Sequence, residues 1–580
     1  MRHTLSYVKN HPNPQLFRED YLLLNGKWDF MFDDDNSGIC HQWHLAFPAN
    51  SKEIIVPYAY QTEDSQINEP THQCDVIWYH KTIELTKISE VINLIFNGVD
   101  YDCQLFVNGN LVGSHCGGYD IFKFDIAKFV KLGKNDLTLR IVDKMNIDQI
   151  RGKQRWRQKS FECFYTETSG IWKDVYIEFL SSTHIDSFYF RPSFKNQNVS
   201  IEINTKEAIN STLNIKVLYL GETIHDEDIL IKDNKEIVEF EINNLNAWSV
   251  ENPNLYDVIL TLSRDTIEKD KVISYFGFND VSSKNGHIYL NNKDTYLKLI
   301  LDQGYYPGGF YTGKEDQFIN DIKLMKEMGF NGCRKHEKIE TPLFNYYCDV
   351  LGFLMWQELP SAHKYSYNYI TTAKKEIKNQ IFDHYNHPSI MCYVIFNESW
   401  GINEVATVNT EIDSCEDVYK YVKSLVSNRF IISNDGWEHT TSDLITFHNY
   451  EETYDQLFNL YKEELPKLKR NEEAQANKDR KMLVKGFSYT GQPLIFSEFC
   501  GLAFTKDKSK GWGYNLVKDE KEFEYKIRKQ IEAIRDLPDI RGYCFTQLSD
   551  VEIEVNGLVD FERKLKIDPK AMKEINDLCE

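Results

Sequence analysis

The sequence of 580 residues lacks any apolar run that approaches the roughly 18 residues of a membrane-spanning helix. Its first 18 residues are polar and contain no apolar core of a secretion signal. The 12 cysteines, spread from Cys40 to Cys579, include no Cys-x-x-Cys pair. This spacing argues against a disulfide framework or a zinc site and favours reduced, buried thiols. We therefore expect a cytoplasmic protein with no membrane segment, no metal and no other cofactor.

Basic residues are in deficit, because 67 Lys and Arg stand against 88 Asp and Glu, a formal net charge of −21. Such an excess of negative charge argues against nucleic acid or an anionic membrane as the main partner. The hydrophobic share of 42% and the charged share of 27% are ordinary for a soluble globular protein. At about 150 residues per domain, the length predicts three or four domains.

The first third of the chain has the pattern of an all-β structure. Asn25-Gly26, Asn97-Gly98 and Asn108-Gly109 are turn dipeptides beside β-type runs, and segments 104–107 and 111–112 flank the last of them as a hairpin. Long helical periodicity is absent. We predict a jelly-roll β-sandwich over residues 1–181.

A second series of strand-like segments follows, at the spacing of a small, immunoglobulin-like sandwich. It predicts a further β-domain over residues 182–276, in which no group of residues suggests chemistry. The strand-like segments are 199–203, 213–220, 236–242 and 256–262.

From Gly277 onward, strand-like and helix-like segments alternate. Helices are expected at 316–328, after Thr341-Pro342 up to Gly352, at 370–385 and at 521–535. The charged segment 461–485 is expected to be an insertion outside the barrel. Eight strands with intervening helices predict one (β/α)8 barrel over residues 277–580. The eight strands are expected at 296–301, 330–333, 353–356, 390–396, 430–432, 444–447, 494–496 and 542–545.

Two carboxylates stand out in this region. Glu398 follows the apolar run 389–396 after one intervening residue, Asn397, and Glu498 follows a similar run about a hundred residues later. A lone Glu at such a place could simply begin a loop. In a barrel, however, the carboxyl ends of the strands form the active-site face. Two carboxylates there are what the hydrolysis of a glycosidic bond requires.

The first domain contains one basic segment, 151–159, with the sequence R-G-K-Q-R-W-R-Q-K. It could be a solvated turn between strands. Alternatively, it reaches a substrate that carries hydroxyl groups or a carboxylate, since arginine binds planar anions through two parallel hydrogen bonds.

Several short motifs resemble the family 2 glycoside hydrolases, which include β-galactosidases, β-glucuronidases and β-mannosidases. The likeness covers nearly the whole chain and implies a jelly-roll, an immunoglobulin-like domain and a catalytic barrel. It also implies hydrolysis of a terminal β-linked sugar with retention of configuration. The barrel motifs include Leu301-Asp302-Gln303-Gly304-Tyr305, Asn397-Glu398-Ser399-Trp400-Gly401, Asn434-Asp435-Gly436-Trp437, His448-Asn449-Tyr450, Ser497-Glu498-Phe499 and Thr546-Gln547-Leu548-Ser549-Asp550; the first domain contributes Arg151-Gly152-Lys153-Gln154 and Thr168-Ser169-Gly170-Ile171-Trp172.

The resemblance also implies roles for individual residues. Glu398 corresponds to the acid/base of the family and Glu498 to its nucleophile. Asn397 resembles the residue that hydrogen-bonds the sugar 2-hydroxyl, and Tyr450 the tyrosine that orients the nucleophile. The positions that line the sugar site are Asp302, His336, Trp400, His448 and Gln547.

Several of these residues have a purely structural alternative: His336 as a core histidine, Trp400 as barrel packing, and Gln547 as a cap on the last strand. Arg334 could pair with a barrel acid, and Glu358 could belong to a charge network.

The sugar is predicted from one motif that is missing. β-Glucuronidases of the family carry an Asn-x-Lys element near the end of the barrel, whereas Asn556 is followed by Gly557 and Leu558. A neutral β-galactoside is therefore our first choice. A β-galacturonide or β-glucuronide is the alternative, with its carboxylate held by Arg155, Arg157 or Arg334.

Two other classes of function are alternatives to a retaining exo-β-glycosidase. A carbohydrate-binding protein without activity would be favoured by loss of either Glu, but both are present. A metal-assisted hydrolase would need ligands at metal spacing, and His336 and His448 have no such partner nearby in sequence. The expected partner is thus a small carbohydrate or glycoconjugate, with a homo-oligomer left open.

Overall fold

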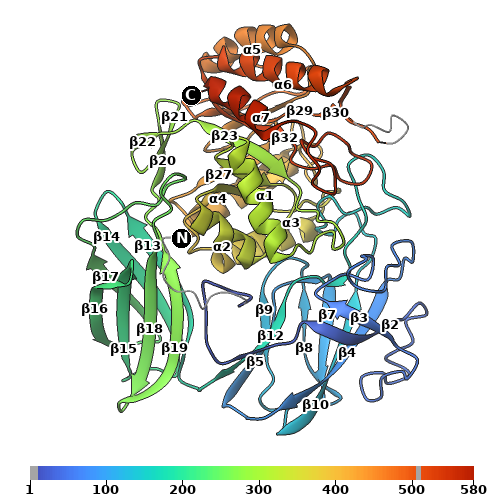
Figure 1. The fold of residues 1–580 in the computed structure, drawn as a ribbon, viewed down its shortest axis with the longest axis vertical. Coiled ribbons are helices and arrows are strands. Elements are labelled where there is room, and N and C mark those ends of the chain that lie inside the picture. Colours follow the sequence, from blue (N-terminus) through green and yellow to red (C-terminus); the bar gives the residue numbers. More distant parts are fainter. Residues whose placement is uncertain (1–10, 505–510, 580) are drawn as a thin grey trace.

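The computed structural model describes residues 11–504 and 511–579. Two β-rich domains lie side by side beneath an α/β barrel in the view of Figure 1. This arrangement confirms the predicted fold class of a jelly-roll sandwich, an immunoglobulin-like sandwich and a (β/α)8 barrel. The exact domain limits stay a prediction. Among the described helices, none is long and apolar enough to cross a membrane.

The first domain consists of a six-stranded sheet, ordered β3-β2-β4-β10-β7-β8, and a four-stranded sheet, ordered β1-β12-β5-β9. Leu105 and Leu139 from the larger sheet share one apolar core with Leu94 and Ile177 from the smaller sheet. The predicted hairpin is confirmed, since Val107 pairs with Asn110 around the Asn-Gly turn. The strands are β1 (Tyr21–Leu23), β2 (Gly26–Phe32), β3 (Lys52–Val56), β4 (Val76–Leu85), β5 (Val91–Phe96), β6 (Val99–Asp100), β7 (Asp102–Val107), β8 (Asn110–Cys116), β9 (Phe122–Asp125), β10 (Gly133–Val142), β11 (Gly170–Ile171) and β12 (Val175–Leu180).

The second domain packs a three-stranded sheet, β13-β14-β17, against a four-stranded sheet, β16-β15-β18-β19. Alternate residues of β14 are buried, as the period of two in its sequence requires. Its strands are β13 (His184–Ser193), β14 (Asn198–Lys206), β15 (Thr212–Tyr219), β16 (Glu222–Leu230), β17 (Lys235–Glu241), β18 (Tyr256–Arg264) and β19 (Ile267–Phe276).

The segment that precedes β1 joins the domains. Arg18 is buried and forms ion pairs with Glu178 of the first domain and Asp270 of the second, at 2.9 and 3.0 Å. Gln15 also donates to the backbone oxygen of Asn386 in the barrel, at 3.3 Å. These contacts help to fix the first domain relative to the barrel.

The barrel sheet contains eight strands in the order β27-β26-β25-β24-β23-β32-β29-β28, and all pairs within it are parallel. All eight residues of β26 are buried, as its unbroken apolar run predicted. The strands at the two ends of this order are β27 and β28. The backbone N–H of His448 on β28 donates to the backbone oxygen of Gly436, directly after β27, at 3.2 Å. The barrel strands are β23 (Leu297–Asp302), β24 (Gly332–Lys335), β25 (Leu354–Glu358), β26 (Ile390–Asn397), β27 (Phe430–Asp435), β28 (Ile445–Asn449), β29 (Leu494–Cys500) and β32 (Ile540–Thr546); the short strands are β20 (Val281–Lys284), β21 (His287–Leu290), β22 (Lys293–Asp294), β30 (Leu502–Ala503) and β31 (Asn515–Leu516).

The expected barrel helices are present. Helix α2 begins at Pro342 and ends before Gly352, whose φ of +70° suits glycine. One prediction was wrong, because residues 461–485 are not wholly an insertion outside the barrel. Their first part belongs to α5, which buries Leu457, Tyr461 and Leu465; its charged outer face misled the prediction. The helices are α1 (Glu315–Glu327), α2 (Pro342–Leu351), α3 (Tyr367–Asp383), α4 (Asn409–Leu425), α5 (Tyr454–Lys469), α6 (Glu520–Arg535) and α7 (Pro569–Asn576), with a short 3₁₀ helix at Asp577–Cys579.

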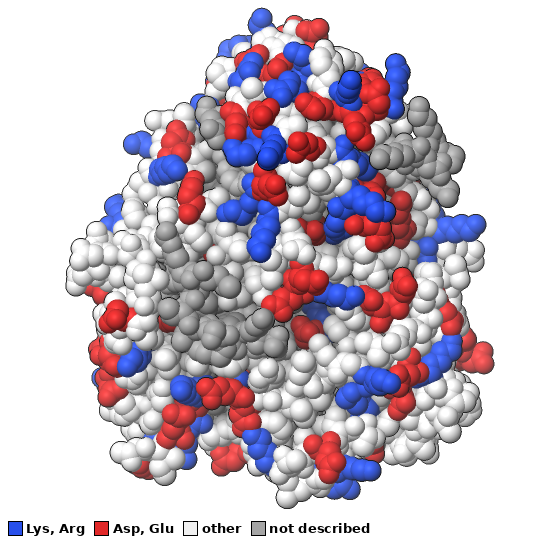
Figure 2. Space-filling view, viewed as in Figure 1, with Lys and Arg blue, Asp and Glu red and all other residues white. Residues whose placement is uncertain are grey.

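Charge is mixed over the face shown in Figure 2, where Asp and Glu lie beside Lys and Arg. The exposed ion pairs of the described surface include Lys469 with Asp539 and Arg470 with Glu472. Exposed pairs of this kind contribute little to stability. The charged groups that matter for chemistry lie inside the barrel instead.

Candidate active site

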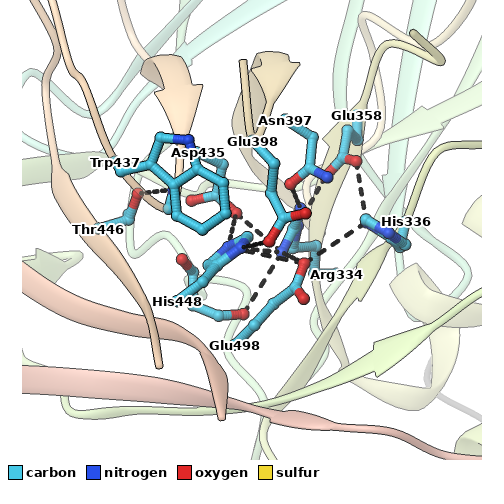
Figure 3. Close-up of polar contacts among 12 residues, drawn as sticks. Arg334, His336, Glu358, Asn397, Glu398, Asp435, Trp437, Thr446, His448 and Glu498 are labelled. Atoms are coloured by element: carbon cyan, nitrogen blue, oxygen red, sulfur yellow. Dashed lines mark hydrogen bonds and ion pairs between the residues drawn. The ribbon is translucent and has the colours of Figure 1, made fainter. Parts of the chain in front are cut away.

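Polar side chains from neighbouring barrel strands converge at the carboxyl ends of those strands (Figure 3). Parallel strands present their carboxyl ends at the same end of a barrel, so residues far apart in sequence meet there. The group consists of Arg334 on β24, Glu358 on β25, Asn397 on β26 with Glu398 directly after it, Asp435 on β27, His448 on β28 and Glu498 on β29.

The carboxylates of Glu398 and Glu498 face one another across this group. An oxygen of each lies within 4.8 Å of an oxygen of the other. The Glu398 side chain is 18% exposed and that of Glu498 is 6% exposed. Glu398 also lines a cleft of about 530 Å³, together with Trp437, Tyr450 and Tyr514. One carboxylate therefore borders the cleft while the other lies deeper.

Arg334 is the centre of the hydrogen-bond network and is completely buried. Its Nε donates to Glu358 at 2.6 Å, and its Nη2 donates to the Asn397 side-chain oxygen at 2.7 Å. Its Nη1 lies 2.8 Å from both Asp435 and Glu498. All three of its nitrogens are thus occupied by protein groups. These contacts match the structural alternative of pairing with barrel acids, and the contact of Arg334 with substrate stays a prediction.

Glu498 is held ionised by its surroundings. Burial alone would raise its pKa, but the charges of His448 and Arg334 lower it to about 2. Tyr450, on the loop after β28, donates its hydroxyl to the second oxygen of Glu498. The Tyr450 ring stacks on Tyr514 with centroids 3.4 Å apart, which fixes its orientation.

His448 connects the two carboxylates. Its Nδ1 lies 2.8 Å from Glu398, and its Nε2 lies 3.0 Å from Asp435 and 3.6 Å from Glu498. Burial disfavours its charge, but the charges of Glu498 and Asp435 raise the pKa of His448 to about 10. Asp435 in turn has its pKa lowered, because Arg334 and His448 outweigh the effect of burial. His448 is therefore an imidazolium at neutral pH.

His336 differs from His448 in its charge. Its Nδ1 lies 3.0 Å from Glu358 and 3.9 Å from Glu498. Burial and the charges of Lys153 and Arg334 hold its pKa well below the ordinary value. Because the imidazole of His336 is neutral, it forms no ion pair with Glu498 and can hydrogen-bond a substrate hydroxyl.

Two groups of described residues have side chains at the spacing of metal ligands. One is Asp34, His72 and Cys74 in the first domain, and the other is Glu398, His448 and Glu498. In the second group the imidazolium uses both nitrogens for hydrogen bonds to carboxylates. A metal ion at this place would have to displace the proton that His448 directs to Glu398.

The basic segment of the first domain does reach the mouth of the barrel. The backbone N–H groups of Arg151 and Gly152 both donate to the Ser361 oxygen, at 3.1 and 3.0 Å. The Trp400 ring packs against Phe164 and His363, with centroids 5.4 and 5.3 Å away. A loop from another domain therefore borders the candidate site.

The two predicted arginines of that segment lie elsewhere. Arg155 is buried and forms an ion pair with Glu167 within the first domain. Arg157 is exposed, with its guanidinium carbon 3.9 Å from the centre of the Phe161 ring. Their prediction as substrate-binding residues is not supported, because the loop turns both side chains to partners in their own domain.

Asp302 and Gln547 lie at the ends of neighbouring strands. Asp302 accepts from Lys335 at 2.6 Å and from the Gly304 N–H at 2.7 Å. Gln547 accepts from Gln303 at 2.6 Å and donates to Asn556, also at 2.6 Å. Both are engaged with protein groups, and their contact with sugar stays a prediction.

Two residues of the site were not among the predicted ones. Asp435 ends β27 as Glu498 nearly ends β29, so the rule of strand-end carboxylates could have found it. Lys153 is buried, with its ammonium nitrogen 4.8 Å from the centre of the Trp400 ring. Its sequence signals are its place in the basic segment and in the motif Arg151-Gly152-Lys153-Gln154, and neither distinguishes it from Arg151 beside it.

Comparison with known proteins gives a consistent assignment for most of the chain. The pattern described as glycosyl hydrolases family 2, sugar binding domain, matches residues 22–180. The pattern described as glycosyl hydrolases family 2 matches residues 183–279, and the TIM barrel domain of that family matches residues 281–507.

Among individual proteins, a putative β-glucuronidase of Formosa agariphila is 29% identical over 61% of this chain and 43% of its own length. A β-galactosidase of Thermoanaerobacter pseudethanolicus is 26% identical over 70% of this chain and 54% of its own. The chain thus spans about half the length of these relatives.

A solved β-glucuronidase from Ruminococcus gnavus in complex with D-glucuronic acid superposes with a TM-score of 0.80. It is 17% identical, and the match covers 99% of this chain and 100% of the other. At this level of identity the likeness establishes the fold.

Proposed function

This chain belongs to glycosyl hydrolases family 2, and from this premise we propose that it is a retaining exo-β-glycosidase. In this proposal Glu498 is the nucleophile and Glu398 is the acid/base. The substrate is a glycoside or glycoconjugate with a terminal β-linked sugar.

One observation supports the proposal most strongly, namely the short distance between the two carboxylates. Retaining glycosidases hold their carboxyl groups about 5–5.5 Å apart, whereas inverting enzymes leave about 6.5–9.5 Å for a water molecule. Oxygens of Glu398 and Glu498 lie within 4.8 Å of each other. This separation fits direct attack by a carboxylate on the sugar.

The reaction then has two displacements. An oxygen of Glu498 attacks the anomeric carbon while Glu398 gives its proton to the departing glycosidic oxygen, and the aglycone leaves as an alcohol. Glu398, now a carboxylate, takes a proton from water. The resulting hydroxide attacks the anomeric carbon and breaks its bond to Glu498. The sugar leaves with its original β configuration, and Glu398 has its proton again.

The surrounding groups fit these roles. Arg334 and Tyr450 each donate to one oxygen of Glu498, which orients the nucleophile and keeps it ionised. His448 donates to one oxygen of Glu398 and leaves the other oxygen for the proton. The side-chain oxygen of Asn397 accepts from Arg334, so its NH₂ group remains as the donor for a sugar hydroxyl.

The sugar itself has two candidates. A neutral β-galactoside is favoured by the missing Asn-x-Lys element. The other candidate is a β-uronide whose carboxylate is bound by an arginine. In the structure, however, Arg155 and Arg334 form ion pairs with protein carboxylates and Arg157 lies on the surface. The cation that remains as a partner for the carboxylate of a uronide is Lys153, which is buried beside Trp400.

The test is hydrolysis of nitrophenyl β-glycosides by the purified protein, with galactoside, glucoside, mannoside, galacturonide and glucuronide as substrates. We expect turnover of at least one of them by the wild type and none by Glu498→Ala. Turnover that survives this substitution without an added anion would contradict the proposed mechanism.

A further inference from the structure

Lys153 is a buried cation of the first domain that lies at the mouth of the barrel, beside Trp400. Its backbone is fixed on both sides, since Gly152 donates to Ser361 in the barrel at 3.0 Å and Tyr165 donates to the Lys153 oxygen at 2.8 Å. The His363 ring lies 2.9 Å from the Gly152 oxygen. The residue is 8% exposed. Its position is therefore determined by the packing between the two domains.

The surroundings of the ammonium group are unusual for a buried lysine. It lies 4.8 Å from the centre of the Trp400 ring and close to the Cys163 thiol. No carboxylate of the described residues lies within ion-pair distance of it, while Glu398, Glu498 and Glu554 are close enough for their charges to act on it. Burial opposes the charge of the ammonium, yet Cys163 and these carboxylates raise the pKa of Lys153, so it stays protonated.

Two other buried lysines near this site have a carboxylate of their own, and buried Lys173 donates to the backbone oxygen of Tyr119 at 2.8 Å. Lys335 pairs with Asp302 at 2.6 Å, and Lys338 pairs with Glu340 at 2.9 Å. Such pairing is the rule for buried charges, because an unpaired buried charge is costly. Lys153 therefore differs in keeping hydrogen-bonding capacity for a group that is not part of this described structure.

Trp400 links the position of Lys153 to that of the candidate acid Glu398. Trp400 comes two residues after Glu398, and Lys153 lies beside the Trp400 ring. In the proposed pose the anomeric carbon sits between Glu398 and Glu498, and we place one edge of the sugar ring toward Lys153, because the ammonium is close enough to both carboxylates for their charges to act on it. A carboxylate on that edge would pair with the ammonium, whereas a neutral hydroxymethyl group would not.

We propose that Lys153 binds the carboxylate of a terminal β-uronide and so makes the enzyme select a uronide over the corresponding neutral sugar. This inference rests on the proposed glycosidase function and specifies its substrate class. Lys153 is a specificity-determining residue in it, not an acid, base or nucleophile.

The experiment compares substrates that differ only in the oxidation of C6. The value of kcat/KM is measured for nitrophenyl β-galacturonide against galactoside, and for glucuronide against glucoside. For at least one pair we expect the wild type to prefer the uronide by about 10- to 100-fold, the value of a charge-assisted hydrogen bond. Lys153→Met should lower that ratio to about 1, and Lys153→Arg should retain part of it.

Lys159→Met is the matched control, since Lys159 is exposed in the same segment and its removal should leave the ratio unchanged. A purely structural role of Lys153 would lower both substrates of a pair equally, and that result would overturn the inference. Inhibition of the wild type by free galacturonate and galactose, and by glucuronate and glucose, gives a second measurement that does not depend on the folding of a variant. Equal inhibition within both pairs would also overturn it.

Different results would contradict the role of Lys153 and the glycosidase function. A wild type that hydrolyses galactoside and rejects both uronides would remove the role of Lys153 and leave the glycosidase intact. A wild type that hydrolyses no β-glycoside of the panel would contradict the proposed function itself.

Discussion

Arg334 Nη1 lies 2.8 Å from Glu498 Oε1, so a buried guanidinium and the candidate nucleophile form one unit. The same guanidinium also binds Asn397, the candidate partner of the sugar 2-hydroxyl, at 2.7 Å. A single rigid group therefore sets the distance between the carboxylate that attacks the anomeric carbon and the amide that binds the neighbouring hydroxyl.

Replacing the nucleophile should stop turnover without unfolding the barrel. We expect Glu498→Ala to lower kcat by at least about a thousandfold. Added azide or formate should restore part of the activity by occupying the place of the missing carboxylate. Glu562→Ala, an exposed acid of the same barrel, serves as control. Full activity of Glu498→Ala in plain buffer would exclude Glu498 as the nucleophile.

Replacing the acid should have an effect that depends on the leaving group. Glu398→Gln removes the proton donor and should lower kcat/KM by about 10²- to 10⁴-fold for alkyl glycosides. Nitrophenyl glycosides need little acid assistance, because their leaving group is a weak base. We expect a much smaller loss in their first displacement, measured as the burst of nitrophenol. An equal loss for both kinds of substrate would count against Glu398 as the donor.

The first sugar product should have the β configuration. Two displacements at the anomeric carbon restore the original stereochemistry. Proton NMR during the first minutes of hydrolysis distinguishes this from the α-anomer before mutarotation mixes them. An α product would mean inversion, which conflicts with the short distance between the carboxylates.

Arg334→Lys should be far more harmful than its conservative character suggests. A lysine ammonium cannot reach four acceptors at once, so at least one of the buried carboxylates loses its partner. We expect destabilisation of about 3–5 kcal/mol and a loss of about 100-fold or more in kcat. Thermal unfolding and kinetics measure the two effects.

The surface variant Arg157→Ala is the comparison for Arg334→Lys and should change neither stability nor kcat, since Arg157 is exposed. A loss of uronide turnover in Arg157→Ala would restore the arginine hypothesis for this residue.

The stability that His448 contributes should fall as the pH rises. Its pKa is raised from 6.5 to about 10 in the folded chain, so its contribution is complete below about pH 6.5 and disappears as the pH rises through about 10. The thermal midpoints of the wild type and His448→Gln should therefore differ most near pH 6 and converge toward pH 10. A difference that grows over this range would show that His448 is buried in its neutral form.

The sequence by itself determined the architecture and the two central carboxylates. An apolar run such as that of β26 forms a strand buried on both faces, and the residue after it must lie at the active-site end of a barrel. Helix starts at Pro342 and turns at Asn108-Gly109 are local in the same way. These predictions succeeded because backbone preference and hydrophobic periodicity act between neighbouring residues.

Only the tertiary structure decided which charged side chains surround those carboxylates. Lys153 and Arg155 are two residues apart in one basic segment, yet one lies beside Trp400 and the other pairs with Glu167. Arg334 points to four acceptors on four other strands of the barrel rather than to open space. The positions of Lys153 and Arg155 depend on how their loop packs against a barrel about 200 residues away in sequence. The energy of a buried charge is set by the groups around it and not by its sequence neighbours.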